Sequence, residues 1–230
     1  MEKQNEIAIL LANRTYLYRL FQNIFGEEPS AKLIDAITSK HTLDALEIPV
    51  TKECQAILQY LPALKEMEDW YLTNKDEALN DLTDEYTRLF LGPTKLPAPP
   101  WESVYVSREP LLFQESTLAV RRCYLKYGVI PQNYPHEADD HLALELDFMA
   151  NLSELTQNAL EQADIDKMLE ILEDQKAFLD DHLLRWVPLF AEKLDASGNT
   201  RMYGNLAHIL REFLKLDRQT LQEIISVLKK

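Results

Sequence analysis

The 230-residue sequence has little glycine and little cysteine, with five and two residues respectively. A β-rich chain of this length uses more glycine in hairpins and bulges, so its scarcity disfavours a sandwich or a barrel. Cys54 and Cys123 are isolated, without a CxxC pair or a histidine at ligand spacing. This usage excludes a disulfide framework and is typical of a reducing compartment. The dispersed glycines also build no dinucleotide or phosphate loop.

Long apolar runs and basic clusters are missing as well. Only six apolar residues in a row, 7–12, precede Arg14. We therefore expect neither a signal peptide nor a membrane span, no stable membrane insertion, and a cytoplasmic protein. The formal net charge of −14 and the lack of a Lys/Arg stripe argue against nucleic acid as a partner and favour a cationic one. The alternative is that the net negative charge only keeps the protein soluble, without a cationic partner.

Helix-forming residues are abundant, and apolar residues recur at helical spacing almost throughout. The spacing predicts an all-α fold, a helical bundle of about 9–11 helices in two halves joined by a hinge. One apolar stripe is formed by Leu79, Leu82, Tyr86, Leu89 and Phe90, and the pair Gly92–Pro93 is expected to end that helix.

Several polar and proline positions predict helix boundaries. Pro62 is expected to kink or restart its helix, and Pro188 to bend a helix over 164–194. Ser116 is expected to cap one helix, and Asp217 to cap a separate last helix after one over about 200–214.

One long stretch, 92–116, has no helical pattern and contains five of the eleven prolines. Loops of this length are more often functional or disordered than plain connectors. Aromatic residues alternate with the prolines here, so we expect a packed segment. The predicted organisation is an N-terminal helical part over 1–128 that includes this Pro/aromatic loop, a hinge over 129–136, and a C-terminal helical part over 137–230.

The stretch YPHEADDHLALELDFM, residues 134–149, concentrates histidines and carboxylates. His136, Glu137, Asp140 and His141 raise the alternative of a helical metal-binding enzyme. The spacing is Glu-x-x-x-His, however, whereas di-iron bundles use Glu-x-x-His on two helices. An aspartate at a helix start has the simpler role of capping free amides. No nucleophile elbow is present either, so an enzyme is the weaker class.

The segment YTRLFLGPTKLPAPPWESVYVSREPLLFQESTLAVRRCYLKYGV, residues 86–129, resembles the central part of the TorD/DmsD family of redox-enzyme maturation chaperones. The proline run into Trp101 is closest to the dimethyl-sulfoxide-reductase chaperone branch. The family's E-P-x-D-H signature follows at 137–141, with Ala138 where the family has proline. Alanine leaves the helix entrance freer than proline would.

The resemblance implies a non-enzymatic, cofactor-free and metal-free chaperone of anaerobic respiration. It would bind the twin-arginine signal peptide of a molybdenum-cofactor reductase precursor and delay export until the cofactor is loaded. The expected form is a monomer or a domain-swapped homodimer. A third hypothesis is that the protein is a permanent subunit or adaptor of a reductase.

A twin-arginine leader offers two guanidinium groups followed by an apolar stretch, so its receptor needs carboxylates and an apolar surface. Glu137 and Asp140 are the predicted carboxylates, and His141 is expected to orient one of them or to donate to the leader. The other wall of the groove is predicted to comprise Tyr86, Leu89, Phe90, Pro100, Trp101 and Tyr105. Leu89 and Phe90 also continue a core stripe, which is the structural alternative for both.

Overall fold

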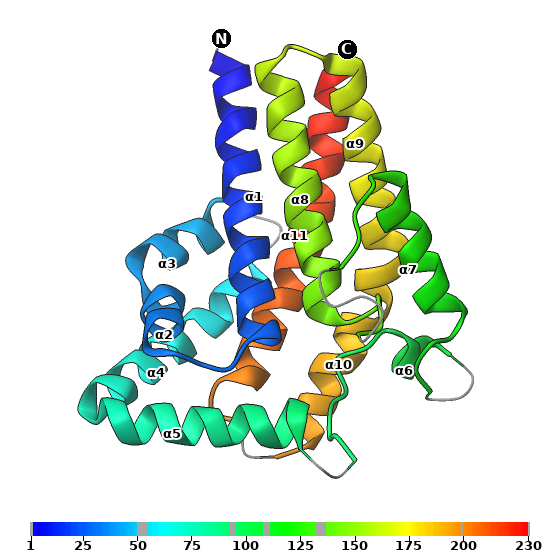
Figure 1. The fold of residues 1–230 in the computed structure, drawn as a ribbon. Coiled ribbons are helices and arrows are strands. Elements are labelled where there is room, and N and C mark those ends of the chain that lie inside the picture. The colour runs from blue at the N-terminus through cyan, green and yellow to red at the C-terminus, as the bar shows by residue number, and fades with distance from the viewer. Residues whose placement is uncertain are drawn as a thin grey trace.

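The computed structural model describes residues 2–49, 55–92, 95–107, 111–131, 137–198 and 200–229. Within these ranges it contains helices and no strand, which confirms the all-α prediction (Figure 1). The elements are α1 (Glu2–Gly26), α2 (Ala31–Thr38), α3 (Lys40–Glu47), the 3₁₀-helix η1 (Ala56–Tyr60), α4 (Leu61–Thr73), α5 (Lys75–Tyr86), the π-helical turn η2 (Thr87–Leu91), α6 (Ser103–Val106), α7 (Glu115–Lys126), α8 (Leu142–Glu161), α9 (Ile165–Phe178), the π-helical turn η3 (Leu179–Leu183), α10 (Leu184–Ala196) and α11 (Tyr203–Leu228).

The helices α1, α8, α9 and α11 form the main bundle, with α1 packed along α8 (Figure 1). Their apolar faces supply much of the buried core. At the lower end of the bundle, α1 and the start of α8 approach closely at Gly26. A β-carbon at Gly26 would lie 2.7 Å from the Ala143 Cβ, so glycine is required there. This close approach fixes the floor of the groove described below.

The helices α2 to α5 form a second group beside the bundle, and α5 crosses below it (Figure 1). Through η2, α5 leads into the Pro/aromatic loop. On the other side, η3 joins α9 to α10. In the part of the chain that the structure describes, none of the helices combines the length and the apolarity that crossing a bilayer requires.

Most predicted boundaries agree with the structure. Pro62 lies in the first turn of α4, directly after η1, so the helix restarts there. The stripe helix ends at Leu91 with Gly92 after it, whereas Pro93 lies outside the described residues. The helix expected over 164–194 is present as α9, η3 and α10 in succession.

Two predicted caps are wrong. The residue before α7 is Gln114, and Ser116 lies inside the first turn of that helix. Asp217 does not begin a helix, because α11 is continuous from Tyr203 to Leu228 and Asp217 is buried in its middle. The aspartate interrupts the apolar pattern because its carboxylate pairs with Arg14 across the bundle.

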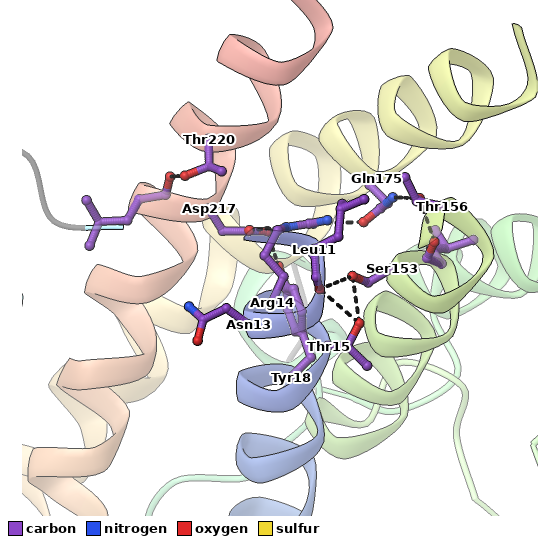
Figure 2. Close-up of polar contacts among 12 residues, drawn as sticks. Leu11, Asn13, Arg14, Thr15, Tyr18, Ser153, Thr156, Gln175, Asp217 and Thr220 are labelled. Carbon is purple, nitrogen blue, oxygen red and sulfur yellow. Dashed lines mark hydrogen bonds and ion pairs between the residues drawn. The ribbon is translucent and has the colours of Figure 1, made fainter. Parts of the chain in front are cut away.

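A buried polar network around this pair ties the four helices of the main bundle together (Figure 2). Arg14 Nε donates to Asp217, and Arg14 Nη2 donates to Asp217 Oδ2 at 3.0 Å and to Gln175 Oε1 at 2.7 Å. Tyr18 donates its hydroxyl to Asp217 over 2.6 Å, and Gln175 in turn donates to Thr156 over 2.8 Å. Burial opposes the charge on Arg14, but Asp217 outweighs burial and the Arg14 pKa is raised. The network therefore holds an ion pair in the core, in which Nε and Nη2 of Arg14 have acceptors and Nη1 has none among the described residues.

The division of the chain at the hinge stays a prediction, since residues 132–136 lie outside the described residues. Helix α1, from the predicted N-terminal part, packs in the same bundle as α8, α9 and α11 from the predicted C-terminal part.

Candidate functional site

The Pro/aromatic loop is joined to the start of α8 by a short backbone pairing. Trp101 and His141 form an isolated antiparallel bridge. The Leu142 N–H donates to the Pro100 carbonyl over 2.8 Å. The indole and imidazole rings meet edge to face with their centroids 5.3 Å apart. Two segments about forty positions apart in the sequence thus meet here.

Asp140 reinforces this junction from behind. Its side chain is 0% exposed. Its Oδ2 accepts the Ser103 N–H at 2.8 Å, and its Oδ1 accepts the Thr117 hydroxyl at 2.9 Å. One carboxylate thereby connects the Pro/aromatic loop, α7 and the start of α8. Both of its oxygens face protein donors, which satisfies the desolvated charge.

A groove of about 750 Å³ opens beside the junction, between the end of α1, η2 and the start of α8. It brings together five of the nine predicted site residues, namely Tyr86, Phe90, Trp101, Glu137 and His141. The other four, Leu89, Pro100, Tyr105 and Asp140, do not line it. Cavities of this size are typical of ligand sites rather than of packing defects.

Three carboxylates line the groove, namely Glu27 at the end of α1, Glu137 and Asp147. Glu137 is half-buried and is held in place by Trp101, whose Nε1–H donates to Glu137 Oε1 at 2.9 Å. Asp147 pairs with Arg19, so part of its charge is neutralised. A carboxylate fixed by an indole is preorganised to accept further N–H donors.

The phenol of Tyr86, which also lines the groove, is affected by nearby carboxylates. Burial is the largest cause that raises its pKa to about 12, and the charges of Glu28 and Glu27 add to the shift. The two carboxylates therefore act inside the groove as well as at the surface of the chain.

Apolar and aromatic side chains also line the groove. Phe90 and Tyr86 pack edge to face with ring centroids 5.3 Å apart. At the rim, Leu91 is 55% exposed and Ile130 is 65% exposed, and Pro131 lies beside them. Exposed apolar side chains gathered at the edge of a cavity are a common feature of binding surfaces.

His141 has a defined local role. Its Nδ1 accepts the Ala143 N–H at 3.1 Å and so caps α8. Burial is the largest influence and lowers its pKa, although Glu137 and Asp140 oppose the shift. The imidazole is therefore neutral at neutral pH and offers its remaining ring nitrogen as a donor.

The predicted residues outside the groove support its walls. Leu89 is buried in the core, and Pro100 is buried at the backbone pairing. Tyr105 stacks on Trp186 with centroids 5.5 Å apart and lines a separate cavity with Lys193. Burial raises the pKa of Tyr105 well above its usual value. Leu89, Pro100 and Tyr105 are apolar or aromatic, as the predicted apolar wall requires, but they face the interior or a neighbouring surface of the protein.

A buried polar network next to the junction was not predicted from the sequence. Glu102 is 0% exposed, and its Oε2 lies 2.8 Å from His182 Nδ1. Glu145, also buried, accepts the Trp186 indole N–H at 3.1 Å. Burial first, and then the charge of Glu102, raise the Glu145 pKa well above its ordinary value.

This network predicts a pH dependence of stability. Burial acts to lower the His182 pKa, but contacts with Cys123 and Glu102 outweigh it and raise the pKa to about 9 from 6.5. The stabilisation is complete below pH 6.5 and is lost as the pH rises through 9. We expect His182 to account for a fall of about 3 kcal/mol in unfolding free energy over that window.

Urea unfolding at pH 6 to 10 measures this fall. The difference between wild type and His182→Gln should shrink towards zero with rising pH. If the unfolding free energy of His182→Gln depended on pH as that of wild type does, His182 would not be the cause of the fall.

The metal-binding alternative is not supported. Among the residues that the structure describes, no group of three or more His, Cys, Asp or Glu side chains is arranged to hold a metal ion. Asp140 turns both oxygens to protein donors, and His141 uses Nδ1 to cap α8. His136 lies outside the described residues.

The chain has known relatives. Residues 43–192 match the family described as nitrate reductase delta subunit. The chain is 28% identical to the chaperone protein TorD of Vibrio parahaemolyticus, over 92% of this chain and 96% of that protein. It is 32% identical to the TorD of Photobacterium profundum over 64% of this chain and 66% of the relative. It is 33% identical to the probable Tat proofreading chaperone DmsD of Haemophilus influenzae, over 55% of each chain.

Proposed function

Since the chain belongs to the family of the nitrate reductase delta subunit and the TorD/DmsD chaperones, we propose that it is a maturation chaperone that binds a twin-arginine signal peptide. The client is the precursor of a molybdenum-cofactor reductase, and binding delays its export until the cofactor is loaded. The protein acts in the cytoplasm, by binding and without turnover. Its relatives' names as chaperones and as a Tat proofreading chaperone support this reading.

The observation that carries the proposal is the pairing of two chemistries in one groove. The groove presents Glu137, fixed by Trp101, together with Glu27. Guanidinium groups form bidentate, charge-assisted bonds with carboxylates, so these two residues take the arginine pair. The exposed apolar rim at Leu91 and Ile130 takes the apolar segment that follows the arginines.

The remaining predicted residues support this assignment indirectly. Asp140, Pro100 and Leu89 lie behind the wall and hold the junction in shape. The net charge of −14 attracts a basic leader at long range and speeds capture without selecting among leaders. The proposed form remains a monomer or a domain-swapped homodimer.

Calorimetric titration with a synthetic twin-arginine leader tests the proposal. We expect saturable binding that weakens with added salt. Glu137→Gln should weaken it about tenfold, because a hydrogen bond to a charged group contributes about 1.5–3 kcal/mol. Glu66→Gln on α4 changes the net charge equally but at an exposed position away from the groove, and should leave the affinity nearly unchanged. Equal effects of the two substitutions, or no saturation, would contradict the proposal.

A further inference from the structure

A second, smaller cavity adjoins the groove where α7 ends, and we refer to it as the α7 pocket. Its volume is about 160 Å³. Four residues line both cavities, namely Tyr124, Val129, Ile130 and Pro131, and the α7 pocket adds Arg121, Leu125 and Asp139. Because the two cavities share these residues, a peptide bound in the groove needs only to cross the exposed Ile130 to enter the α7 pocket.

The polar groups of the α7 pocket have partners within the protein. Arg121 Nε donates to Asp139 Oδ2 at 2.6 Å, so the two charges in the lining form an ion pair. The Tyr124 hydroxyl donates to the Asp139 backbone carbonyl over 2.9 Å. The remaining lining side chains are aliphatic, from Leu125, Val129, Ile130 and Pro131. The pocket therefore offers a ligand apolar surface without net charge, whereas three carboxylates line the groove.

Exposed leucines extend this apolar surface along the outside of α7, which lies at the edge of the molecule (Figure 1). Leu125 is 58% exposed, and Leu118, two turns earlier on the same face, is 45% exposed. Single exposed apolar side chains are common on protein surfaces and need no explanation. Here, however, Leu125 lines a pocket next to the groove, and Leu118 follows it along the helix.

The length of a leader's apolar segment fits this extended surface. Such a segment has about 7–15 residues and is about 10–22 Å long as a helix. It therefore carries several large side chains, more than Leu91 and Ile130 at the rim of the groove can cover. Along α7, the distance from Leu125 to Leu118 is about 10 Å, at a rise of about 1.5 Å per residue. The α7 pocket and the face beyond it match in length the part of the leader that extends past the rim.

We propose that the α7 pocket is a second subsite for the twin-arginine leader and takes one large apolar side chain from the segment that follows the arginines. The inference rests on the proposed function and deepens it, because it adds a position at which the protein selects the apolar segment. A volume of about 160 Å³ admits a leucine or phenylalanine side chain, since one water needs only about 10–15 Å³ by this measure. A charged side chain is excluded there, because it would be desolvated without a partner.

The charges give the bound leader one direction. The carboxylates of the groove, Glu137 among them, attract the arginines. In the α7 pocket, Arg121 already neutralises Asp139 and repels a second guanidinium. The arginine end of the leader therefore stays in the groove. Since the apolar segment follows the arginines, the leader runs from Glu137 across Ile130 to Leu125.

A double-mutant cycle, measured by calorimetric titration, tests the subsite. Leu125→Ser shortens a side chain that lines the α7 pocket but not the groove. We expect it to weaken binding of the intact leader about fivefold, because part of a leucine's apolar contact is lost. On the leader, each large apolar residue after the arginines is replaced by serine in turn. At the position that fills the pocket, serine should weaken binding to wild type about fivefold but to Leu125→Ser less than about twofold, because the two side chains contact each other.

Two further variants make the result specific. Leu72→Ser, on α4 and 55% exposed, is the matched control and should leave the leader affinity unchanged. Glu137→Gln should weaken every leader of the series about equally, because it acts on the arginines. Equal effects of Leu125→Ser and Leu72→Ser would overturn the subsite, while a groove still sensitive to Glu137→Gln would stand. If the intact leader did not bind wild type at all, the proposed function would be overturned and the subsite with it.

Photo-cross-linking provides a second measurement that does not depend on a loss of affinity. A photoreactive phenylalanine analogue replaces Leu125 or Ile130 in separate variants of the full chain. We expect the cross-links from Leu125 on leader residues farther from the arginines than those from Ile130. The reverse order would overturn the direction of binding. Cross-links from Leu125 to a second copy of this chain, with none to the leader, would assign the outer face of α7 to self-association and overturn the subsite.

Discussion

Replacing Asp217 by alanine is expected to lower the free energy of unfolding by about 3–5 kcal/mol, because it leaves the buried Arg14 guanidinium without its partner. Arg14 is 3% exposed and loses both of its bonds to the carboxylate. Tyr18, which also donates to Asp217, loses its acceptor. Urea unfolding of wild type and variant at pH 7 measures the difference. Most natural domains have a total stability of only about 5–15 kcal/mol, so this loss is large.

The double variant Arg14→Met with Asp217→Leu provides the control. It removes both charges and fills the space with apolar side chains, so much of the stability lost in Asp217→Ala should return. A loss below about 1 kcal/mol in Asp217→Ala would show that the pair is solvated, because breaking a surface ion pair costs no more than that.

Replacing Asp140 by alanine is expected to lower the free energy of unfolding by about 3 kcal/mol, because two buried donors lose their acceptor. These are the Ser103 N–H and the Thr117 hydroxyl. The loss loosens the junction that positions Trp101 and Glu137, so leader affinity falls together with stability.

Asp140→Asn separates this positioning role from direct contact with the leader. The asparagine carbonyl still accepts the Ser103 N–H, and its amide donates to the Thr117 hydroxyl, which accepts as well as donates. We expect Asp140→Asn to keep most of the stability and to bind the leader within about threefold of wild type. If Asp140 contacted a guanidinium directly, affinity would fall by about 1.5–3 kcal/mol while stability stayed the same. Chemical unfolding and leader titration on both variants distinguish the two outcomes.

The all-α architecture was predictable because apolar residues at helical spacing mark the buried faces in almost every segment. The family resemblance, rather than periodicity, predicted that Trp101, Glu137 and His141 line one groove. It placed Trp101 on the opposite wall, however, whereas the indole donates directly to Glu137. What composition and spacing did not reveal is where each polar atom finds its partner. Asp140 has the residue type of a ligand for guanidinium, yet both of its oxygens are used inside the protein.

Asp217 illustrates the same limit in a helix. An aspartate that interrupts an apolar stripe resembles a helix start, because carboxylates commonly cap free amides. Its partner Arg14 lies 203 positions earlier in the chain, and only the folded bundle brings the two together. Glu102 and Glu145 were missed for a related reason, since a carboxylate becomes buried only when a distant group satisfies it.

Site-directed photo-cross-linking with a twin-arginine leader tests the groove assignment most directly. A photoreactive phenylalanine analogue is placed at Leu91 or Ile130 on the apolar rim, and at Leu72 on α4 as an equally exposed apolar control, 55% exposed like Leu91. We predict cross-links to the apolar segment of the leader from Leu91 and Ile130 and none from Leu72. Cross-links from Leu72 alone, or equally from all three positions, would show that the leader binds outside the groove.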